Sequence, residues 1–149
     1  METTISLIAL IISIISGGFT LYTFWWTNRR DRKQEALNTF HCLQSEVFDN
    51  INAISKNTIK EIAKDLQSKE FTEYSHYLVR IEQFCIGINA GIYDFSITKK
   101  IAAQYLNNIY YKSLPVIEQR RKMFPDEPQC TEFESVVKKM NKGLKGVSR

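Results

Sequence analysis

The chain has few of the residues that break helices, and it lacks the short motifs of several common enzyme classes. Glycine is absent between Gly18 and Gly87, and no proline occurs before Pro115. No segment alternates apolar and polar residues as a half-buried strand does. A Gly-rich phosphate loop and a nucleophile elbow are also missing, so the chemistry of those motifs has no support here. This scarcity of breakers predicts long helices and an all-α fold.

The cysteines and histidines are too few and too scattered for a metal or redox site. The chain has three cysteines, at positions 42, 85 and 130, and two histidines. That odd number and wide spacing predict neither a disulfide framework nor a zinc site. A di-iron bundle needs two Glu-x-x-His pairs, and only Glu73 and His76 supply one, because Asn38 stands three residues before His41. We therefore expect no metal, no cofactor and no catalytic residues, and hence a protein that is not an enzyme.

Charge is missing altogether from Ile5 to Trp26. As a helix rising about 1.5 Å per residue, this segment reaches roughly 33 Å, close to the ~30 Å hydrocarbon core of a bilayer. A cleaved signal peptide would need basic residues before the apolar run and small residues after it, whereas this chain has bulky aromatic and basic residues after it. Residues 1–28 are therefore predicted to form a transmembrane anchor.

The residues at the end of the apolar segment predict its orientation. Aromatic side chains are followed at once by basic ones: Tyr22, Trp25, Trp26, Arg29, Arg30, Arg32 and Lys33. Aromatic rings with a polar edge prefer the headgroup level, and cytoplasmic flanks carry an excess of Lys and Arg. These residues form the predicted membrane interface, with membrane lipid as partner of the basic ones. The prediction places the N-terminus outside a bacterial inner membrane and the C-terminal domain in the cytoplasm.

Small residues recur every four positions within the apolar segment, at Ala9, Ser13 and Gly17. This spacing puts them on one face of a helix, where small side chains let two backbones approach closely. The pattern predicts packing between anchors, and so a homo-oligomer.

The first helix is predicted to continue from the membrane into the cytoplasm without a break. Apolar residues from Leu37 to Ile54 keep three- and four-residue spacing and make one face. An interruption is expected at 55–58, where Thr58 and Glu61 have the spacing of a capping box that restarts the helix.

The best-patterned segment lies between residues 71 and 92. Its apolar residues alternate spacings of three and four: Phe71, Tyr74, Leu78, Ile81, Cys85, Ile88 and Ile92. A heptad seam of this kind is typical of helix association. The Phe71–Ile92 seam is therefore a second predicted surface for self-association, besides the anchor.

The remaining helices complete a small antiparallel bundle over residues 29–124. One helix is expected over 96–111 and another over 114–124, with Ser113 as its N-cap and Pro115 in its first turn. Residues 125–149 are assigned to a loop, an amphipathic helix and a basic tail, with Thr131 and Glu134 spaced as a capping box. That helix suits packing on the domain or lying on the membrane surface.

One stretch combines polar residues with small ones near the seam. Its candidate polar site consists of Arg80, Glu82, Asn89, Tyr93 and Asp94. The pattern E-x4-G-x-N-x-G-I-Y-D from Glu82 to Asp94, the anchor with its basic exit, and a helix ending at Arg120 resemble a family of small bacterial membrane proteins classified as a domain of unknown function. The resemblance implies a single-pass protein with a helical cytoplasmic domain, and no activity, cofactor or catalytic residue.

Three functions remain open at this point. The sequence favours a membrane-anchored interaction or scaffold protein that self-associates or binds a cytoplasmic protein partner, with lipid favoured over nucleic acid for the basic cluster at the anchor. An oligomerising membrane effector, for example in phage defence, is the second hypothesis. A membrane-tethered enzyme using Arg80, Glu82 and Asn89 is the third.

Overall fold

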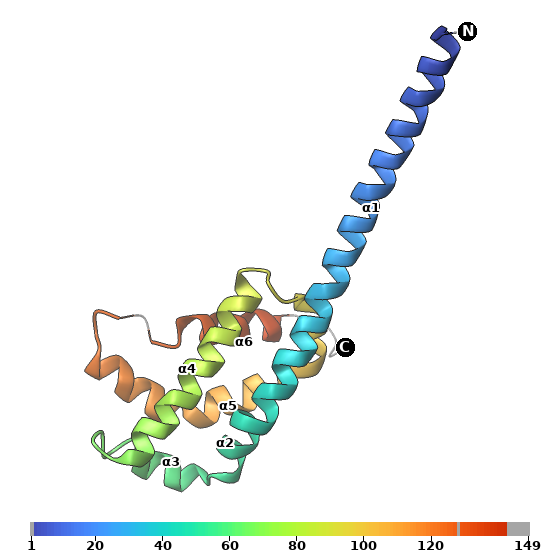
Figure 1. Ribbon diagram of the computed structural model, residues 1–149. Coiled ribbons are helices and arrows are strands. Elements are labelled where there is room, and N and C mark those ends of the chain that lie inside the picture. Colours follow the sequence, from blue (N-terminus) through green and yellow to red (C-terminus); the bar gives the residue numbers. More distant parts are fainter. Residues whose placement is uncertain (1, 128, 143–149) are drawn as a thin grey trace.

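A computed structural model describes residues 2–127 and 129–142; among the first nine residues it describes the side chain of Leu7 alone (Figure 1). In chain order the elements are α1 (Glu2–Leu43), the π-helix η1 (Gln44–Phe48), α2 (Asp49–Ala53), α3 (Lys56–Ile62), α4 (Lys69–Asn89), α5 (Phe95–Met123) and α6 (Thr131–Lys142). The fold is 86% helical, and no strand occurs in the described part. The predicted all-α fold, a long N-terminal apolar helix followed by a helical bundle, is confirmed.

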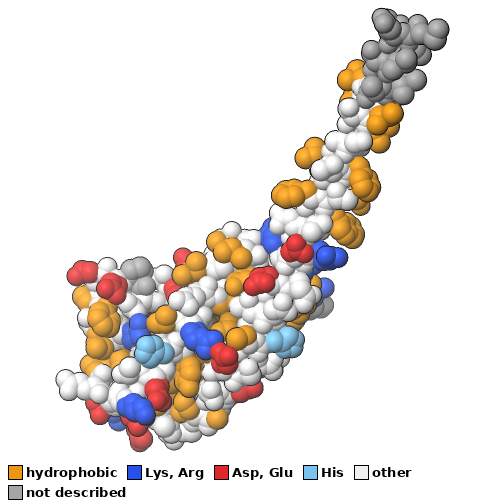
Figure 2. Space-filling model, in the orientation of Figure 1, with side chains coloured by type: hydrophobic (Ala, Val, Ile, Leu, Met, Phe, Trp, Pro, Cys, Tyr) orange, Lys and Arg blue, Asp and Glu red, His pale blue; other side chains and the backbone are white. Residues whose placement is uncertain are grey.

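The first half of α1 projects from the bundle as a straight, isolated helix (Figure 1). Every side chain from Leu10 to Arg32 is exposed, and the first buried one is Ala36. Figure 2 shows hydrophobic side chains on all visible sides of this projection. By length and composition the helix can cross a membrane, and none of the tested apolar window is buried inside the protein.

The α1 helix runs directly into η1 and α2, so the chain stays helical as far as Ala53. The widened π turn carries Val47 and Phe48 into the core. Ile54 then takes an extended conformation and ends this long helix. The predicted interruption is present, but its cap is Ser55, whose hydroxyl accepts a hydrogen bond from the Thr58 backbone N–H at 3.1 Å. The capping box predicted to begin at Thr58 is wrong, because Ser55 already satisfies that N–H.

The Phe71–Ile92 seam lies inside the bundle. Six of its seven side chains are buried, and only Ile92 is exposed. The helix α4 packs against α6, α5, α1 and η1, so neighbours in the same chain cover the seam. This corrects the interpretation of the seam as a surface for a second copy: a heptad pattern marks an apolar stripe, and here the stripe is the core of a single bundle.

A single helix, α5, replaces the two predicted over 96–111 and 114–124. Pro115 lies inside it, although proline removes a helical hydrogen bond and costs about 3 kcal/mol in a helix interior. Burial on both sides of the proline offsets this cost: Ser113, Val116 and Ile117 are each 0% exposed. The predicted N-cap Ser113 is instead a buried residue, and its Oγ lies 2.7 Å from the Tyr74 hydroxyl.

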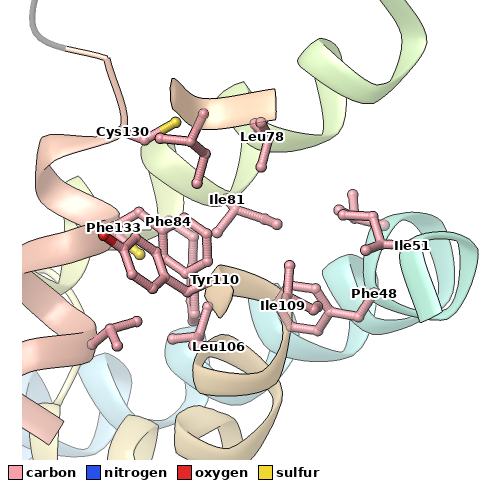
Figure 3. Packing of buried hydrophobic residues seen from close by; sticks show 14 of the residues in the cluster. Phe48, Ile51, Leu78, Ile81, Phe84, Leu106, Ile109, Tyr110, Cys130 and Phe133 are labelled. Atoms are coloured by element: carbon pink, nitrogen blue, oxygen red, sulfur yellow. The ribbon is translucent and has the colours of Figure 1, made fainter. Parts of the chain in front are cut away.

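The amphipathic segment near the C-terminus packs as α6 on α4 and α5. Its apolar stripe of Phe133, Val136, Val137 and Met140 is buried. Figure 3 shows the Phe133, Phe84 and Tyr110 rings gathered in one cluster with residues of α4 and α5. The apolar side of α6 is thus part of the bundle core. Of the two arrangements predicted for this helix, packing on the domain is the one that the structure shows.

Candidate functional site

The predicted polar site lies at the C-terminal end of α4 and in the turn leading to α5. Glu82 and Asn89, both on α4, contact α6. Tyr93 and Asp94 lie in the turn. Arg80 is separate from them and faces η1. Each of these side chains has a partner inside the protein.

Glu82 caps the N-terminus of α6. Its Oε1 accepts a hydrogen bond from the Glu132 backbone N–H at 2.9 Å, and its Oε2 accepts one from the Phe133 N–H at 2.8 Å. The first N–H groups of a helix lack partners within the helix, and a carboxylate there also interacts favourably with the helix dipole. The cap of α6 therefore comes from another helix, and the capping box predicted at Thr131 and Glu134 is wrong.

Asn89 links the same two helices nearer the end of α4. Its Nδ2 donates to the Glu132 carboxylate at 2.5 Å, and its Oδ1 accepts from Lys139 Nζ at 2.6 Å. Because both ends of the amide are bonded to α6, Asn89 fixes how α4 and α6 lie along each other.

The two glycines of the motif serve the turn between α4 and α5. Gly91 has φ of 74°, a left-handed conformation that favours glycine. Around it the Ile92 N–H donates to the Gly87 carbonyl at 2.9 Å and the Gly91 N–H to the Ile88 carbonyl at 3.2 Å, which is a Schellman motif. Gly87 also makes room for Tyr93, since a Cβ on Gly87 would lie 2.3 Å from Tyr93 Cε2.

Tyr93 and Asp94 complete the turn. The Tyr93 ring packs on Phe84 with centroids 5.1 Å apart. The Asp94 Oδ1 accepts a hydrogen bond from the Ile97 N–H at 3.0 Å and caps α5, while the Asp94 N–H donates to the Arg32 carbonyl of α1 at 3.5 Å. The E-x4-G-x-N-x-G-I-Y-D motif is thus a junction that joins α4 to α1, α5 and α6.

Arg80 lies on another face of α4 and forms an ion pair with Glu46 of the π-helix. A hydrogen bond from Arg80, and then one from Cys42, lowers the pKa of Glu46. A shallow hollow of about 200 Å³ beside the pair is lined by residues of α1, α4 and the turn: Thr39, Cys42, Leu43, Arg80, Gln83, Phe84 and Tyr93. No residue of the π-helix lines this hollow.

The buried cysteines are poor nucleophiles. Burial raises the pKa of Cys130 to about 11 and that of Cys85 well above its usual value. The thiolate is the reactive form of cysteine, so both stay protonated at neutral pH. No cluster of three or more His, Cys, Asp or Glu suited to a metal is found within residues 2–127 and 129–142.

A hollow of about 600 Å³ opens between α5 and α6. It is lined by Asn107, Tyr110, Tyr111, Val137, Lys138, Asn141 and Lys142. Across this hollow the Asn141 Nδ2 donates a hydrogen bond to Asn107 Oδ1 at 3.0 Å.

Two groups of polar contacts that help to hold the bundle together were not predicted from the sequence. Tyr74 and Ser113 form a buried hydroxyl pair, and burial raises the pKa of Tyr74 to about 12. Glu134 binds Lys138 at 2.5 Å and Arg121 at 2.7 Å, and these two partners, Lys138 first, lower its pKa to about 2. Only the Glu134–Lys138 spacing of four residues could be read in advance.

The predicted interface residues of α1 lie together at the point where the apolar segment ends. The Tyr22 and Trp26 rings stack with centroids 6.3 Å apart, and the Arg29 guanidinium lies 5.2 Å from the centroid of the Trp25 ring. Trp26, Arg29, Arg30 and Lys33 line one shallow depression. Aromatic and basic side chains therefore form one patch on α1 at the end of the apolar segment, which we call the collar.

Comparison with known families gives a match over most of this architecture. The family described as a domain of unknown function (DUF4760) matches residues 10–140. The chain belongs to the DUF4760 family. The match runs from the apolar part of α1 to the end of the α6 core, which confirms the resemblance to a family of unknown function. Searches of the curated proteins and of the solved structures gave no match.

Proposed function

We propose that this DUF4760 chain is a single-pass membrane-anchored interaction protein that holds its helical bundle against the cytoplasmic face of a bacterial inner membrane. The observation that carries the proposal is the exposure of every side chain from Leu10 to Trp26 on a helix of spanning length. An apolar helix this long in water would expose far more contiguous apolar surface than soluble proteins normally do. A bilayer supplies the missing apolar surroundings.

The collar of aromatic and basic residues supports the orientation. Trp25 and Trp26 prefer the headgroup level, and Arg29, Arg30 and Lys33 follow within two turns of helix. By the positive-inside rule the N-terminus lies outside and the bundle in the cytoplasm. Because α1 enters the bundle without a break, the bundle is rigidly coupled to the anchor.

Self-association through the anchor is part of the proposal. Ser13 and Gly17 are exposed on α1, and a Cβ added at Gly17 would meet no atom within 4 Å. The third member of the predicted face, Ala9, has its side chain outside the described part. Small residues four apart favour close packing of membrane helices. A cytoplasmic protein partner would then bind the bundle of such an oligomer.

A scaffold role fits the polar residues better than catalysis does. Glu82, Asn89 and Asp94 are bonded to backbone or side chains of neighbouring helices, so their polar groups stabilise the junction. We therefore propose no reaction for this protein.

Two glycines in the anchor allow a matched test. At about 100° per residue, Gly18 lies far round the helix from the face of Ser13 and Gly17. We expect in-cell crosslinking of the full chain to give a dimer or higher oligomer that Gly17→Leu weakens and Gly18→Leu leaves unchanged. Equal crosslinking in both variants would refute association through this face.

Membrane integration is checked on the same samples. The chain should stay in the membrane pellet after alkaline extraction, and recovery in the supernatant would refute the anchor. Mass spectrometry of the crosslinked material then identifies any partner on the bundle. Overproduction of the chain followed by loss of membrane potential would favour the oligomerising effector instead.

A further inference from the structure

The turn between α4 and α5 exposes apolar side chains on a bundle that otherwise buries its seam. Ile92, the last residue of the seam, is 57% exposed, and Phe95, the first residue of α5, is 38% exposed. Ile86, in the last turns of α4, is 47% exposed. Ile92 lies in the turn itself, and Phe95 lies at the start of α5.

Hydrogen bonds on both sides define the backbone of the turn. The Ile92 N–H is bonded to the Gly87 carbonyl, and Gly91 is fixed in the left-handed conformation. Asp94 caps α5 on the other side of the turn. Because the end of α4 and the start of α5 are both capped here, the backbone position of Ile92 is defined by these hydrogen bonds.

The turn lies against α1 close to the predicted membrane surface. The Asp94 N–H donates to the Arg32 carbonyl at 3.5 Å, and a Cβ on Gly91 would lie 3.5 Å from the Arg32 guanidinium. Arg32 follows Trp26 by six positions, or about 9 Å along the helix axis. The headgroup layer on each side of a bilayer is about 5–8 Å thick. Gly91 and Asp94, which lie against Arg32, are therefore near its outer edge. A tilt of α1 of about 20°, which is usual, can bring their neighbours Ile92 and Phe95 to the headgroup layer.

The arrangement of the bundle agrees with this placement. In Figure 1 the turn between α4 and α5 lies beside α1 at the end of the bundle from which the projecting helix leaves, and α3 lies at the opposite end. Figure 2 shows hydrophobic side chains at the end near the projection. Lys99 and Lys100 follow Phe95 within the first two turns of α5 and add positive charge there. Positive charge beside exposed apolar side chains suits an anionic leaflet.

We propose that the turn between α4 and α5 is a second membrane contact, in which Ile92 and Phe95 insert into the headgroup layer of the leaflet that α1 enters. This inference rests on the proposed anchoring by α1. The bundle then has two attachments to the bilayer, and its orientation about the α1 axis is fixed. The occupant of the turn is a lipid surface, because the turn is continuous with the collar that meets the same headgroups.

Depth-dependent quenching tests the proposal on the full chain. The protein is placed at low density in vesicles of phosphatidylethanolamine and phosphatidylglycerol that carry spin-labelled lipid. A fluorescent maleimide is attached to Ser96→Cys in a Cys42→Ser background, because Ser96 is exposed next to Phe95 and the other two cysteines are buried. Asn57→Cys is the control, since it is exposed on α3 at the far end of the bundle.

We expect the label at Ser96→Cys to be quenched several-fold more than the label at Asn57→Cys. Adding Ile92→Ser and Phe95→Ser should reduce that quenching toward the control. Equal quenching at the two sites would overturn the proposal, as would a blue-shifted but unquenched label at Ser96→Cys, which indicates a protein partner at the turn.

The tryptophans distinguish failure of this inference from failure of the anchor. Trp25 and Trp26 are the chain's two tryptophans, so lipid-borne quenching of their fluorescence reports α1 independently of the label. Quenched tryptophans with an unquenched turn refute the second contact and leave the anchor in place. Unquenched tryptophans refute the anchor and the second contact together.

Discussion

The substitution Gly87→Ala tests the reading of the E-x4-G-x-N-x-G-I-Y-D motif as a packed junction. The added Cβ would lie 2.3 Å from Tyr93 Cε2, 2.8 Å from Cδ2 and 3.2 Å from Cζ. Ordinary contacts between carbon atoms are about 3.5–4.0 Å, so the ring has to move by more than 1 Å. Tyr93 packs on Phe84 in its present position, and that contact is lost or weakened when the ring moves.

Two opposing effects set the magnitude. Overpacking of this kind costs about 1–3 kcal/mol. Replacing glycine by alanine in a helix favours the helix by up to about 1 kcal/mol, and less near a helix end. We expect Gly87→Ala to destabilise the bundle by about 1–2 kcal/mol overall. Far-UV circular dichroism during urea unfolding of the full chain in detergent micelles measures this, because the anchor stays helical and contributes a constant signal.

A double-mutant cycle makes the prediction specific to the Tyr93 ring. In a Tyr93→Ala background the clash is absent, so Gly87→Ala should stabilise the bundle by a few tenths to about 1 kcal/mol. The sign of the effect therefore changes between the two backgrounds, with a coupling energy of about 2 kcal/mol. The same loss of stability in both backgrounds would refute the reasoning, since the cost would then not come from the ring.

Three further predictions concern the polar contacts of the bundle. Tyr74→Phe should cost about 1–2 kcal/mol in the same unfolding assay, because it leaves the buried Ser113 hydroxyl without its partner; Ser113→Ala added to it should recover part of the loss, and no recovery would refute the pair. Glu82→Gln should cost about 1 kcal/mol and loosen α6 first, seen as faster amide exchange at its first turn, whereas unchanged exchange there would contradict the cap. Because its basic partners lower the pKa of Glu134 to about 2 from 4.5, the stability that it contributes is present above pH 4.5 and is lost as the pH falls toward 2. We expect up to about 1 kcal/mol, reduced by solvent screening, from the difference between wild type and Glu134→Gln over that range, and an identical pH dependence in the two would refute it.

Much of this fold could be predicted from the sequence, because most of its helices carry a regular apolar stripe. The apolar part of α1 contains no charge, and the seam of α4 and the stripe of α6 keep three- and four-residue spacing. The pattern does not show what covers the stripe: it predicts a second copy at the seam of α4, whereas α5 and α6 of the same chain cover it. The prediction that a new helix starts at Pro115 is wrong for a related reason. Contacts with the other helices bury the residues around Pro115 and keep α5 continuous, and these contacts cannot be seen in the sequence of α5 alone.

The polar junction was predicted as a group of residues but not as a set of contacts. The motif pointed to Glu82, Asn89 and Asp94 because polar residues beside an apolar seam need partners. Their roles depend on α6 and α5, which meet α4 only after folding, so spacing along the chain could not reveal them. Arg80 is close to these residues in the sequence, but its partner is Glu46 of η1, which is distant along the chain and packs against another face of α4.

The central claim, that α1 crosses a membrane with the bundle on the cytoplasmic side, is tested most directly by cysteine labelling in spheroplasts. Two versions of the full chain are compared: the natural one, whose Cys42 is exposed on the bundle, and Glu2→Cys in a Cys42→Ser background. We predict that a membrane-impermeant maleimide labels Glu2→Cys in intact spheroplasts and Cys42 only after permeabilisation. Labelling of Cys42 in intact spheroplasts, with Glu2→Cys protected, would contradict the account.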